Sequence, residues 1–396
     1  MKDIKLQMQK SIEDTLYYDK ENAIDTIIKI VFESILRCER KEFLSNDSSQ
    51  VNKANGYYRR LAQGINKYFE LDIPRDRLSL FKPVLLECVK ARDEQMQELA
   101  FKLYTKGLTT RDINSIFAEV YDKNLSPSAV SSITKEFEQE RIAWQNKSLV
   151  SDYYFIYIDA LFMPIRRETV EKEAFYIVFG MRPDLTREIL GVYNIPQESA
   201  SGWREVFHDL KQRGLNKCLM VVADGLAGLS QVIGEELPGT KFQRCIVHKI
   251  RNLLIKVRAS DKRAVSDDFK KVFEVGTQDY TKEKAKQRLA LFIDKWKDKY
   301  LWIEKKFDEY DFDFYFAYLN FPWQIHSMIY TTNWIERLNK TIRKTTKIRN
   351  SFPNSDSALN LICALLIEKE NTNYRKYPVT AFSGVKDILE DKIEKL

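Results

Sequence analysis

The spacing of apolar residues changes from helical to strand-like near residue 150. In the first part, Ile24, Ile27, Ile28 and Val31 recur three or four positions apart, which is the period of one helix face. A polar, turn-rich stretch follows, and then the short segments NGYYRR and IPRDR. We interpret residues 1–90 as a small helical unit with one or two short strands.

Residues 91–148 have the pattern of three helices. The periodicity predicts helices over 91–104 and 110–120, and Ser126 followed by Pro127 is typical of an N-cap with proline at the first helical position. The last two helices fit a DNA-reading helix-turn-helix, and an ordinary helical hairpin fits the same pattern. The outward polar residues that would contact DNA are Ser128, Ser131 and Lys135.

Beyond residue 150 the sequence is rich in β-branched and aromatic runs, which predict strands. Helices are expected at 202–213 and 226–237, each just before one of the last two strands. Three strands close together, followed by alternating helices and strands, indicate a mixed α/β sheet in the element order of the RNase H-like fold. The predicted strands are 153–158, 174–181, 187–195, 218–223 and 241–247.

A long segment after these strands lacks helix breakers. There is no proline between Gly239 and Pro322 and no glycine between Gly276 and Gly384, so the segment is expected to be helical. It contains a dense run of aromatic residues over 296–323. We expect most of them to form a helical core.

Two stretches concentrate basic residues in a chain with 64 Lys and Arg against 57 Asp and Glu. Residues 241–263 hold eight bases and one acid, and residues 335–349 hold six bases and one acid. Such clusters favour a polyanionic partner, although a solvated helix face has the same composition.

Composition excludes several classes of protein. With 44% hydrophobic residues the chain can bury a core, so disorder is excluded. No apolar run reaches the roughly 18 residues of a membrane helix, and the first residues lack the apolar stretch of a signal peptide. Five scattered cysteines without a CxxC pair favour a reducing compartment. We therefore expect a cytoplasmic protein.

Three carboxylates are the candidates for chemistry. Asp159 and Asp224 follow predicted strands, where the carboxyl ends of an open sheet bind ligands, and Glu336 precedes a basic stripe of Lys340, Arg343 and Lys347 on a predicted helix. Like-charged carboxylates at one point would hold Mg²⁺ or Mn²⁺, and two such ions can clamp a phosphoryl displacement.

Simpler interpretations of the same residues stay open at this point. A strand-terminal aspartate often caps a turn, and Glu336 could pair with Lys340 four residues later on a solvent face. Asn333 and Asn339 could bond phosphate or sugar, or could be surface amides.

Cys245 and His248 form an isolated CxxH. Zinc usually needs four ligands, or three and a water, and the sequence offers only two further histidines and no CxxC, so we do not expect a zinc site. A structural or positioning role beside the basic helix is the preferred interpretation. A Cys–His nucleophilic pair is the alternative, but no third orienting group is evident. Glycine-rich phosphate loops are absent from the sequence.

Together these motifs resemble the DDE transposases of bacterial insertion sequences in the Mutator-like superfamily. The resemblance spans about residues 30–370. It rests on the segments VVADG, QRCIVHKIRN and TTNWIERLN, together with NGYYRR, PRDR, LTTRDI, SPSAVS and LKQRGL, all in family order.

The resemblance implies a catalytic triad of Asp159, Asp224 and Glu336 that binds two Mg²⁺ or Mn²⁺ ions. It also implies cleavage and strand transfer on double-stranded DNA, at terminal inverted repeats and at a target, by a copy-out/paste-in route. A homodimer at the nucleoid is expected, without a membrane or a small-molecule substrate. The residues expected to contact DNA in the catalytic part are Arg166, Lys249, Arg251, Asn333, Asn339, Lys340, Arg343 and Lys347.

The expected fold is an α/β, RNase H-like mixed-sheet core interrupted by an all-helical insertion, with helical N-terminal DNA-binding domains. Two alternatives in function are a non-catalytic DNA-binding protein derived from a transposase and a nuclease that cuts without joining. A generic α/β protein is a third.

The expected parts are an N-terminal helical region for dimerisation or end binding (1–90), a helix-turn-helix-like domain (91–148), the first part of the core (149–250), the insertion (251–325), the last part of the core (326–372) and a C-terminal tail (373–396).

Overall fold

The computed structural model divides the chain into two compact units, Met1–Glu136 and Phe137–Leu396. The finer division into six parts stays a prediction. The second helix of the expected helix-turn-helix, with Ser128, Ser131 and Lys135, lies outside the described residues. The structure describes residues 13, 23–46, 51–63, 68–121, 137–195, 198–307, 309–347 and 349–396.

The first unit combines helices with a two-stranded sheet. Helix α2 contacts the hairpin through Leu36, which packs with Leu71 and Ile73. One or two short strands were predicted here, and the structure has two, β1 and β2, which contain NGYYRR and most of IPRDR and pair in antiparallel fashion. The helix predicted at 91–104 begins earlier, directly after Pro83, because proline suits the start of a helix. The elements are α2 (Ala23–Asn46), β1 (Ala54–Gln63), β2 (Tyr68–Asp76), α3 (Val84–Thr105) and α4 (Thr110–Tyr121).

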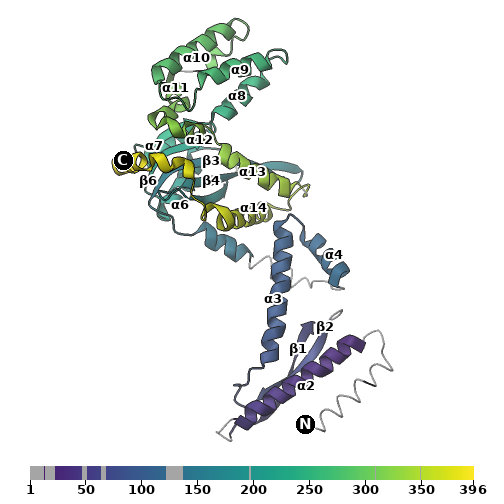
Figure 1. Ribbon diagram of the computed structural model, residues 1–396. Coiled ribbons are helices and arrows are strands. Elements are labelled where there is room, and N and C mark those ends of the chain that lie inside the picture. The colour runs from purple at the N-terminus through teal and green to yellow at the C-terminus, as the bar shows by residue number, and fades with distance from the viewer. Residues whose placement is uncertain are drawn as a thin grey trace. The chain divides into compact units, whose positions relative to one another are not determined.

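A five-stranded mixed sheet forms the centre of the second unit (Figure 1). Its order is β5-β4-β3-β6-β7, with β3, β4 and β5 antiparallel and with β6 and β7 parallel to β3. The predicted mixed α/β class is therefore confirmed. The strands are β3 (Asp152–Arg166), β4 (Val170–Met181), β5 (Arg187–Asn194), β6 (Lys217–Ala223) and β7 (Lys241–Arg244).

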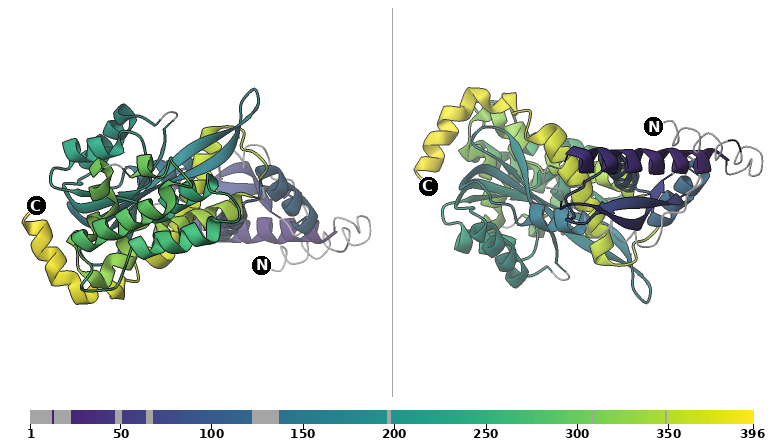
Figure 2. Two further views of the ribbon diagram at one scale, coloured as in Figure 1. Left: turned by 90° about the horizontal axis from the view of Figure 1, so that it is seen from above. Right: turned by 90° about the horizontal axis from the view of Figure 1, so that it is seen from below.

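Helices cover both faces of this sheet. On one face, Trp203 and Phe207 of α6 (Ala200–Gln212) and Val232 of α7 (Leu229–Glu236) pack into the main core. On the other, Trp334 of α13 stacks on Tyr157 of β3. The right view of Figure 2 shows α6 and α7 and the C-terminal segment on opposite sides of the sheet. The helices of the second face are α13 (Asn333–Thr346), α14 (Ser355–Lys369) and α15 (Lys386–Glu394).

The last strand is shorter than the predicted 241–247. β7 ends at Arg244, the amide of Cys245 donates to the carbonyl of Ala223, and helix α8 begins at Ile246. The apolar residues of this stretch recur at helical spacing, so Ile246 and Leu253 are buried as one face of α8. Cys245 and His248 therefore lie at the start of a helix and not on a strand.

The described residues between β7 and α13 form helices joined by short turns and contain no strand, in agreement with the predicted helical segment. Its aromatic residues pack on one another: Phe269 contacts Phe292 and Phe307, and Phe273 stacks on Phe316. No helix within the described ranges is both long enough and apolar enough to cross a membrane. The helices here are α8 (Ile246–Ile255), α9 (Lys262–Val272), α10 (Lys282–Lys297), α11 (Glu309–Tyr315) and α12 (His326–Ile329), with short 3₁₀ turns at Glu304–Lys306, Ala317–Asn320 and Trp323–Ile325.

A buried ionic network links β5 to the segment after α14. The carboxylate of Glu188, which is 2% exposed, accepts hydrogen bonds from Tyr153 Oη at 2.9 Å and Arg375 Nη2 at 2.7 Å, and lies 3.2 Å from Lys147 Nζ. Lys147 and Arg375 also bind the buried Glu370. Burial raises the pKa of Glu188, but the charge of Lys147 and the hydrogen bond from Tyr153 outweigh it, so the pKa is lowered.

We expect Glu188→Gln to destabilise the protein by about 3 kcal/mol, because it removes one of the two buried carboxylates that neutralise Lys147 and Arg375. A lowered folded pKa stabilises the fold above the unfolded value of 4.5, and this stabilisation is lost as the pH falls through the folded value. The difference between wild type and variant should therefore shrink under acid conditions. Denaturant unfolding at several pH values measures it, with the exposed Glu171→Gln as control. A difference that does not change with pH would contradict this role for Glu188.

Candidate active site

Asp159 lies on the face of the sheet that α13 covers. Side chains alternate along β3, so Asp159 points to the same side as Tyr157, which stacks on Trp334 of α13. Its side chain is buried, with 6% exposed, and its Oδ2 accepts a hydrogen bond of 2.7 Å from Asn339 Nδ2. Asn339 is itself 1% exposed. It is therefore not the surface amide that the sequence left open.

Asp224 follows directly on β6, the strand next to β3. The parallel ladder pairs Ile158 with Ala223, so Asp159 and Asp224 come immediately after paired residues of adjacent strands. This is the adjacency that the sequence analysis required for a shared site. Asp224 is half-buried, and its Oδ1 accepts a hydrogen bond of 2.7 Å from the amide of Gly225.

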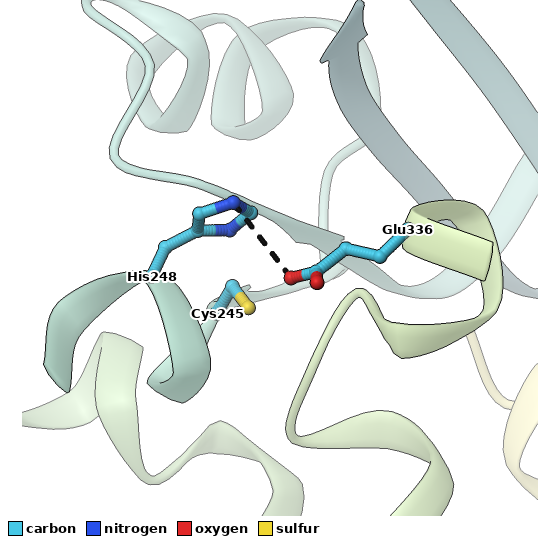
Figure 3. Close-up of side chains that lie close together, drawn as sticks. All are labelled: Cys245, His248 and Glu336. Atoms are coloured by element: carbon cyan, nitrogen blue, oxygen red, sulfur yellow. Dashed lines mark ion pairs between the residues drawn. The ribbon is translucent and has the colours of Figure 1, made fainter. Parts of the chain in front are cut away.

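Glu336 comes from the first turn of α13. The buried residues Ile335, Leu338 and Ile342 form the predicted apolar face of this helix. Glu336 Oε2 lies 2.9 Å from Arg251 Nη2, and Oε1 lies 3.7 Å from His248 Nε2, as the dashed line in Figure 3 shows. Its ion-pair partners thus come from α8, whereas the sequence had offered Lys340 as an alternative partner.

All three carboxylates line one cavity of about 520 Å³. Glu198, in the loop before α6, adds a fourth acid that the sequence analysis missed; its carboxylate accepts a hydrogen bond from Tyr176 Oη. No pattern in the sequence marks Glu198, because it lies in a loop and neither directly follows a predicted strand nor belongs to a predicted helix face. The cavity is lined by Asp159, Ala160, Phe162, Glu198, Asp224, Leu226, His248, Arg251, Glu336, Asn339, Lys340 and Arg343.

Two titratable groups at the cavity have raised pKa values, which favours the neutral form of Asp159 and the charged form of His248. Burial is the largest cause that raises the pKa of Asp159 to about 6, and the charge of Glu336 adds to it, while His248 and Asn339 act against it. The hydrogen bond with Cys245 is the largest cause that raises the pKa of His248 to about 9, and the charges of Asp224 and Asp159 add to it against burial. The carboxylates thus favour a nearby cation, and His248 supplies one.

Cys245 is held beside this cavity by α13. Its Sγ is the acceptor for the backbone amide of Thr332 at 3.4 Å and for Thr332 Oγ1 at 3.2 Å, and the residue is 1% exposed. The Sγ atom, a ring nitrogen of His248 and a carboxylate oxygen of Glu336 lie within 4.8 Å of one another.

The residues of the second unit that were expected to contact DNA, apart from Asn339, fall into three groups. Lys340 and Arg343 line the cavity, while Asn333 and Lys347 are exposed at the two ends of α13. Arg166 is exposed at the end of β3 and donates to Ser351 Oγ. The third group lies on α8: Arg251 binds Glu336, and Lys249 donates to the carbonyl of Lys306 and to Tyr315 Oη.

Comparison with known proteins identifies the class of protein to which this fold and site belong. Residues 1–376 match the family model described as "Transposase, Mutator family". The chain therefore belongs to the Mutator family of transposases and is a DNA-processing enzyme.

Similar curated proteins are named as transposases of insertion sequence elements. The transposase for insertion sequence element IS905 of Lactococcus lactis subsp. lactis is 32% identical over 97% of this chain and 96% of its own length. The transposase for IS1201 of Lactobacillus helveticus is 31% identical over 88% of this chain and 93% of its own. The transposase for IS256 in transposon Tn4001 of Staphylococcus aureus is 29% identical over 91% and 93%.

Proposed function

We propose that this transposase binds the terminal inverted repeats of an insertion sequence and cleaves and joins DNA strands with two divalent ions held by Asp159, Asp224 and Glu336. One observation carries the proposal: carboxylates from three distant segments line a single cavity together with Lys340 and Arg343. A cavity lined by carboxylates and basic residues suits a metal-dependent reaction on a phosphodiester.

The residues present fit hard divalent cations. Asp159 is buried with a raised pKa, and Glu336 Oε1 is buried without a hydrogen-bond partner, so both carboxylates have oxygens that a cation could bind. Carboxylate oxygens are the ligands that Mg²⁺ and Mn²⁺ prefer. When bound, such ions supply Lewis acidity at the scissile phosphate. The strand order β5-β4-β3-β6-β7, with three antiparallel strands first, supports the assignment to an RNase H-like core.

The protein groups around the carboxylates have separate tasks in this proposal. Lys340 and Arg343 hold phosphates at the cavity wall, and Lys347 extends the contact along α13. Asn339 fixes the orientation of the Asp159 carboxylate through its hydrogen bond. His248 and Arg251 neutralise Glu336 when no metal is bound.

Product analysis tests the function directly. The purified chain is incubated in Mg²⁺ with DNA that carries both ends of the element surrounding its own gene. We expect nicks at the ends followed by joined strands. Hydrolysis without joining would favour the nuclease, and tight binding to the ends without metal-dependent cutting would favour the DNA-binding derivative.

Lys347→Ala should weaken DNA binding by a similar factor on every sequence. Lys347 is exposed at the C-terminal end of α13, and in this proposal it contacts phosphates and not bases. Its loss should reduce the slope of log K against log salt by about 1. Binding titrations at several salt concentrations measure this, with Lys386→Ala on α15 as control. A loss confined to one DNA sequence would contradict a phosphate contact.

A further inference from the structure

The start of α8 and the first turn of α13 bring together one sulfur, one nitrogen and one oxygen ligand. Figure 3 shows the side chains of Cys245, His248 and Glu336 converging from these two helices. Within the part of the chain that the structure describes, this is the one group of three potential metal ligands found at such close range.

The geometry points to a binding site for Zn²⁺, or a cation of similar softness, formed by Cys245, His248 and Glu336, of which only Glu336 is also a ligand of the proposed magnesium ions. Three protein ligands and one open position for water is the arrangement of non-structural zinc centres. A thiolate with an imidazole selects Zn²⁺ over Mg²⁺, which prefers oxygen ligands alone.

The distances suit one ion after a small adjustment. The three ligand atoms lie within 4.8 Å of one another, with 3.7 Å between His248 Nε2 and Glu336 Oε1. Zinc bonds of about 2.0–2.3 Å in tetrahedral geometry place two ligands roughly 3.5 Å apart. A pair of ligand atoms at the 4.8 Å limit must therefore approach by about 1 Å, which side-chain rotation can supply.

The protein holds two of the ligands in place already. Cys245 is the N-cap residue of α8 and His248 lies three positions later, a spacing that puts both on one side of a helix. Two donors from Thr332 point at the sulfur, as they would at a thiolate ligand. His248 Nδ1 and Glu336 Oε1 are buried without a hydrogen-bond partner. Buried polar atoms without a hydrogen-bond partner suit a ligand set.

An ion can reach this group from the adjoining cavity. Cys245 lines a second cavity of about 420 Å³, and Asp224 lines both this cavity and the one that contains His248 and Glu336. On binding, the thiol proton of Cys245 and the imidazolium proton of His248 pass to the buffer, and the sulfur and nitrogen lone pairs form the new bonds.

The site shares Glu336 with the proposed catalytic metal ions. A zinc-bound Glu336 is withdrawn from the magnesium ligands, so zinc acts as an inhibitor of strand cleavage. Zinc binding itself does not depend on the proposed function, but this inhibitory effect does.

Cobalt serves as the spectroscopic probe, because Co²⁺ occupies zinc sites and a thiolate ligand gives it a near-ultraviolet charge-transfer band. We expect the metal-free, full-length chain to bind one Co²⁺ with this band, even in excess Mg²⁺, and added Zn²⁺ to abolish it. Cys245→Ser should lose the band, and Cys38→Ser, which changes an exposed cysteine on α2, should retain it. Absence of the band in wild type, or its persistence in Cys245→Ser, would overturn the proposal.

Two further variants keep the test decisive if Cys245→Ser does not fold. His248→Gln should weaken Co²⁺ binding by more than the roughly 10–100-fold typical of outer partners of a metal site, and Glu336→Gln should do the same. His208→Gln, on the exposed side of α6, should not. Unchanged affinity in His248→Gln would exclude this ligand set. None of these measurements uses DNA, so they stand whether or not cleavage is observed.

The inhibitory effect is tested separately on DNA. At fixed Mg²⁺, added Zn²⁺ should slow cleavage by wild type more strongly than cleavage by Cys245→Ser, each compared with its own rate without zinc. Equal inhibition of both proteins would show that zinc acts elsewhere. Failure of cleavage in both, with the cobalt band intact, would reject the proposed function and leave the zinc site standing.

Discussion

Glu336→Gln should bind the ends of the element as wild type does and cleave them about 10³-fold more slowly or not at all. Glutamine keeps the shape of the side chain and removes the charge that holds a divalent ion, so the loss falls on the reaction and not on binding. The fold should tolerate the change, because Arg251, the closer partner of Glu336, is more than half exposed, and such pairs contribute about 1 kcal/mol or less.

End-labelled DNA in Mg²⁺ measures both properties of this variant, since nicking and retardation are read from the same mixture. Glu205→Gln is the matched control, because Glu205 is an exposed glutamate on α6, on the other face of the sheet. Cleavage at the wild-type rate by Glu336→Gln would remove Glu336 from the catalytic triad. A cooperative unfolding transition at lower temperature would instead assign it a structural role.

Asn339→Leu should raise the Mg²⁺ concentration for half-maximal cleavage by about 10–100-fold, the usual cost of losing an outer partner of a metal ligand. The 2.7 Å hydrogen bond from Asn339 is the contact that orients the buried Asp159 carboxylate and opposes the rise of its pKa. Without it, the carboxylate has more rotational freedom and is harder to ionise, so the metal binds less tightly.

The concentration dependence separates positioning from a general loss of structure. If Asn339 acts through Asp159, saturating Mg²⁺ should restore most of the cleavage rate of Asn339→Leu. Thr341→Ala, on an exposed part of the same helix, should leave the half-maximal concentration unchanged. A rate that is reduced equally at all Mg²⁺ concentrations would contradict the positioning role.

Local pattern predicted which segments form strands, but it did not predict where β3 ends. Runs of β-branched and aromatic residues predict β3 and β6, and Asp224 directly follows β6 as expected. The strand predicted over 153–158 was too short, because β3 continues to Arg166, so Asp159 lies within the strand and not at its end. The apolar period of α13 likewise predicted which side of that helix is buried. The end of β7 was misplaced, because the apolar run continues into α8 without a break in composition.

Contacts between distant segments could not be predicted in this way. Asn339 and Asp159 are 180 positions apart, and nothing in the local pattern distinguishes a buried amide that binds a carboxylate from an exposed one. The same applies to His248 and Glu336, where the CxxH was recognised and its third neighbour was not. Such pairs depend on how α8 and α13 pack on the sheet, which hydrophobic periodicity leaves undetermined.

In the proposed complex, the length of helix α13 determines how far along the DNA its basic residues reach from Glu336. From Glu336 to Lys347 the chain advances eleven positions along one helix, which is about 16 Å at 1.5 Å per residue. One strand of a duplex presents a phosphate every 3.4 Å or so along its axis, so 16 Å of protein helix corresponds to roughly five nucleotides. In the proposed complex, the basic residues of α13 thus act as a ruler. They fix the distance between the cleavage site and the phosphates that the protein binds. An insertion of one residue between Glu336 and Lys340 would change this distance.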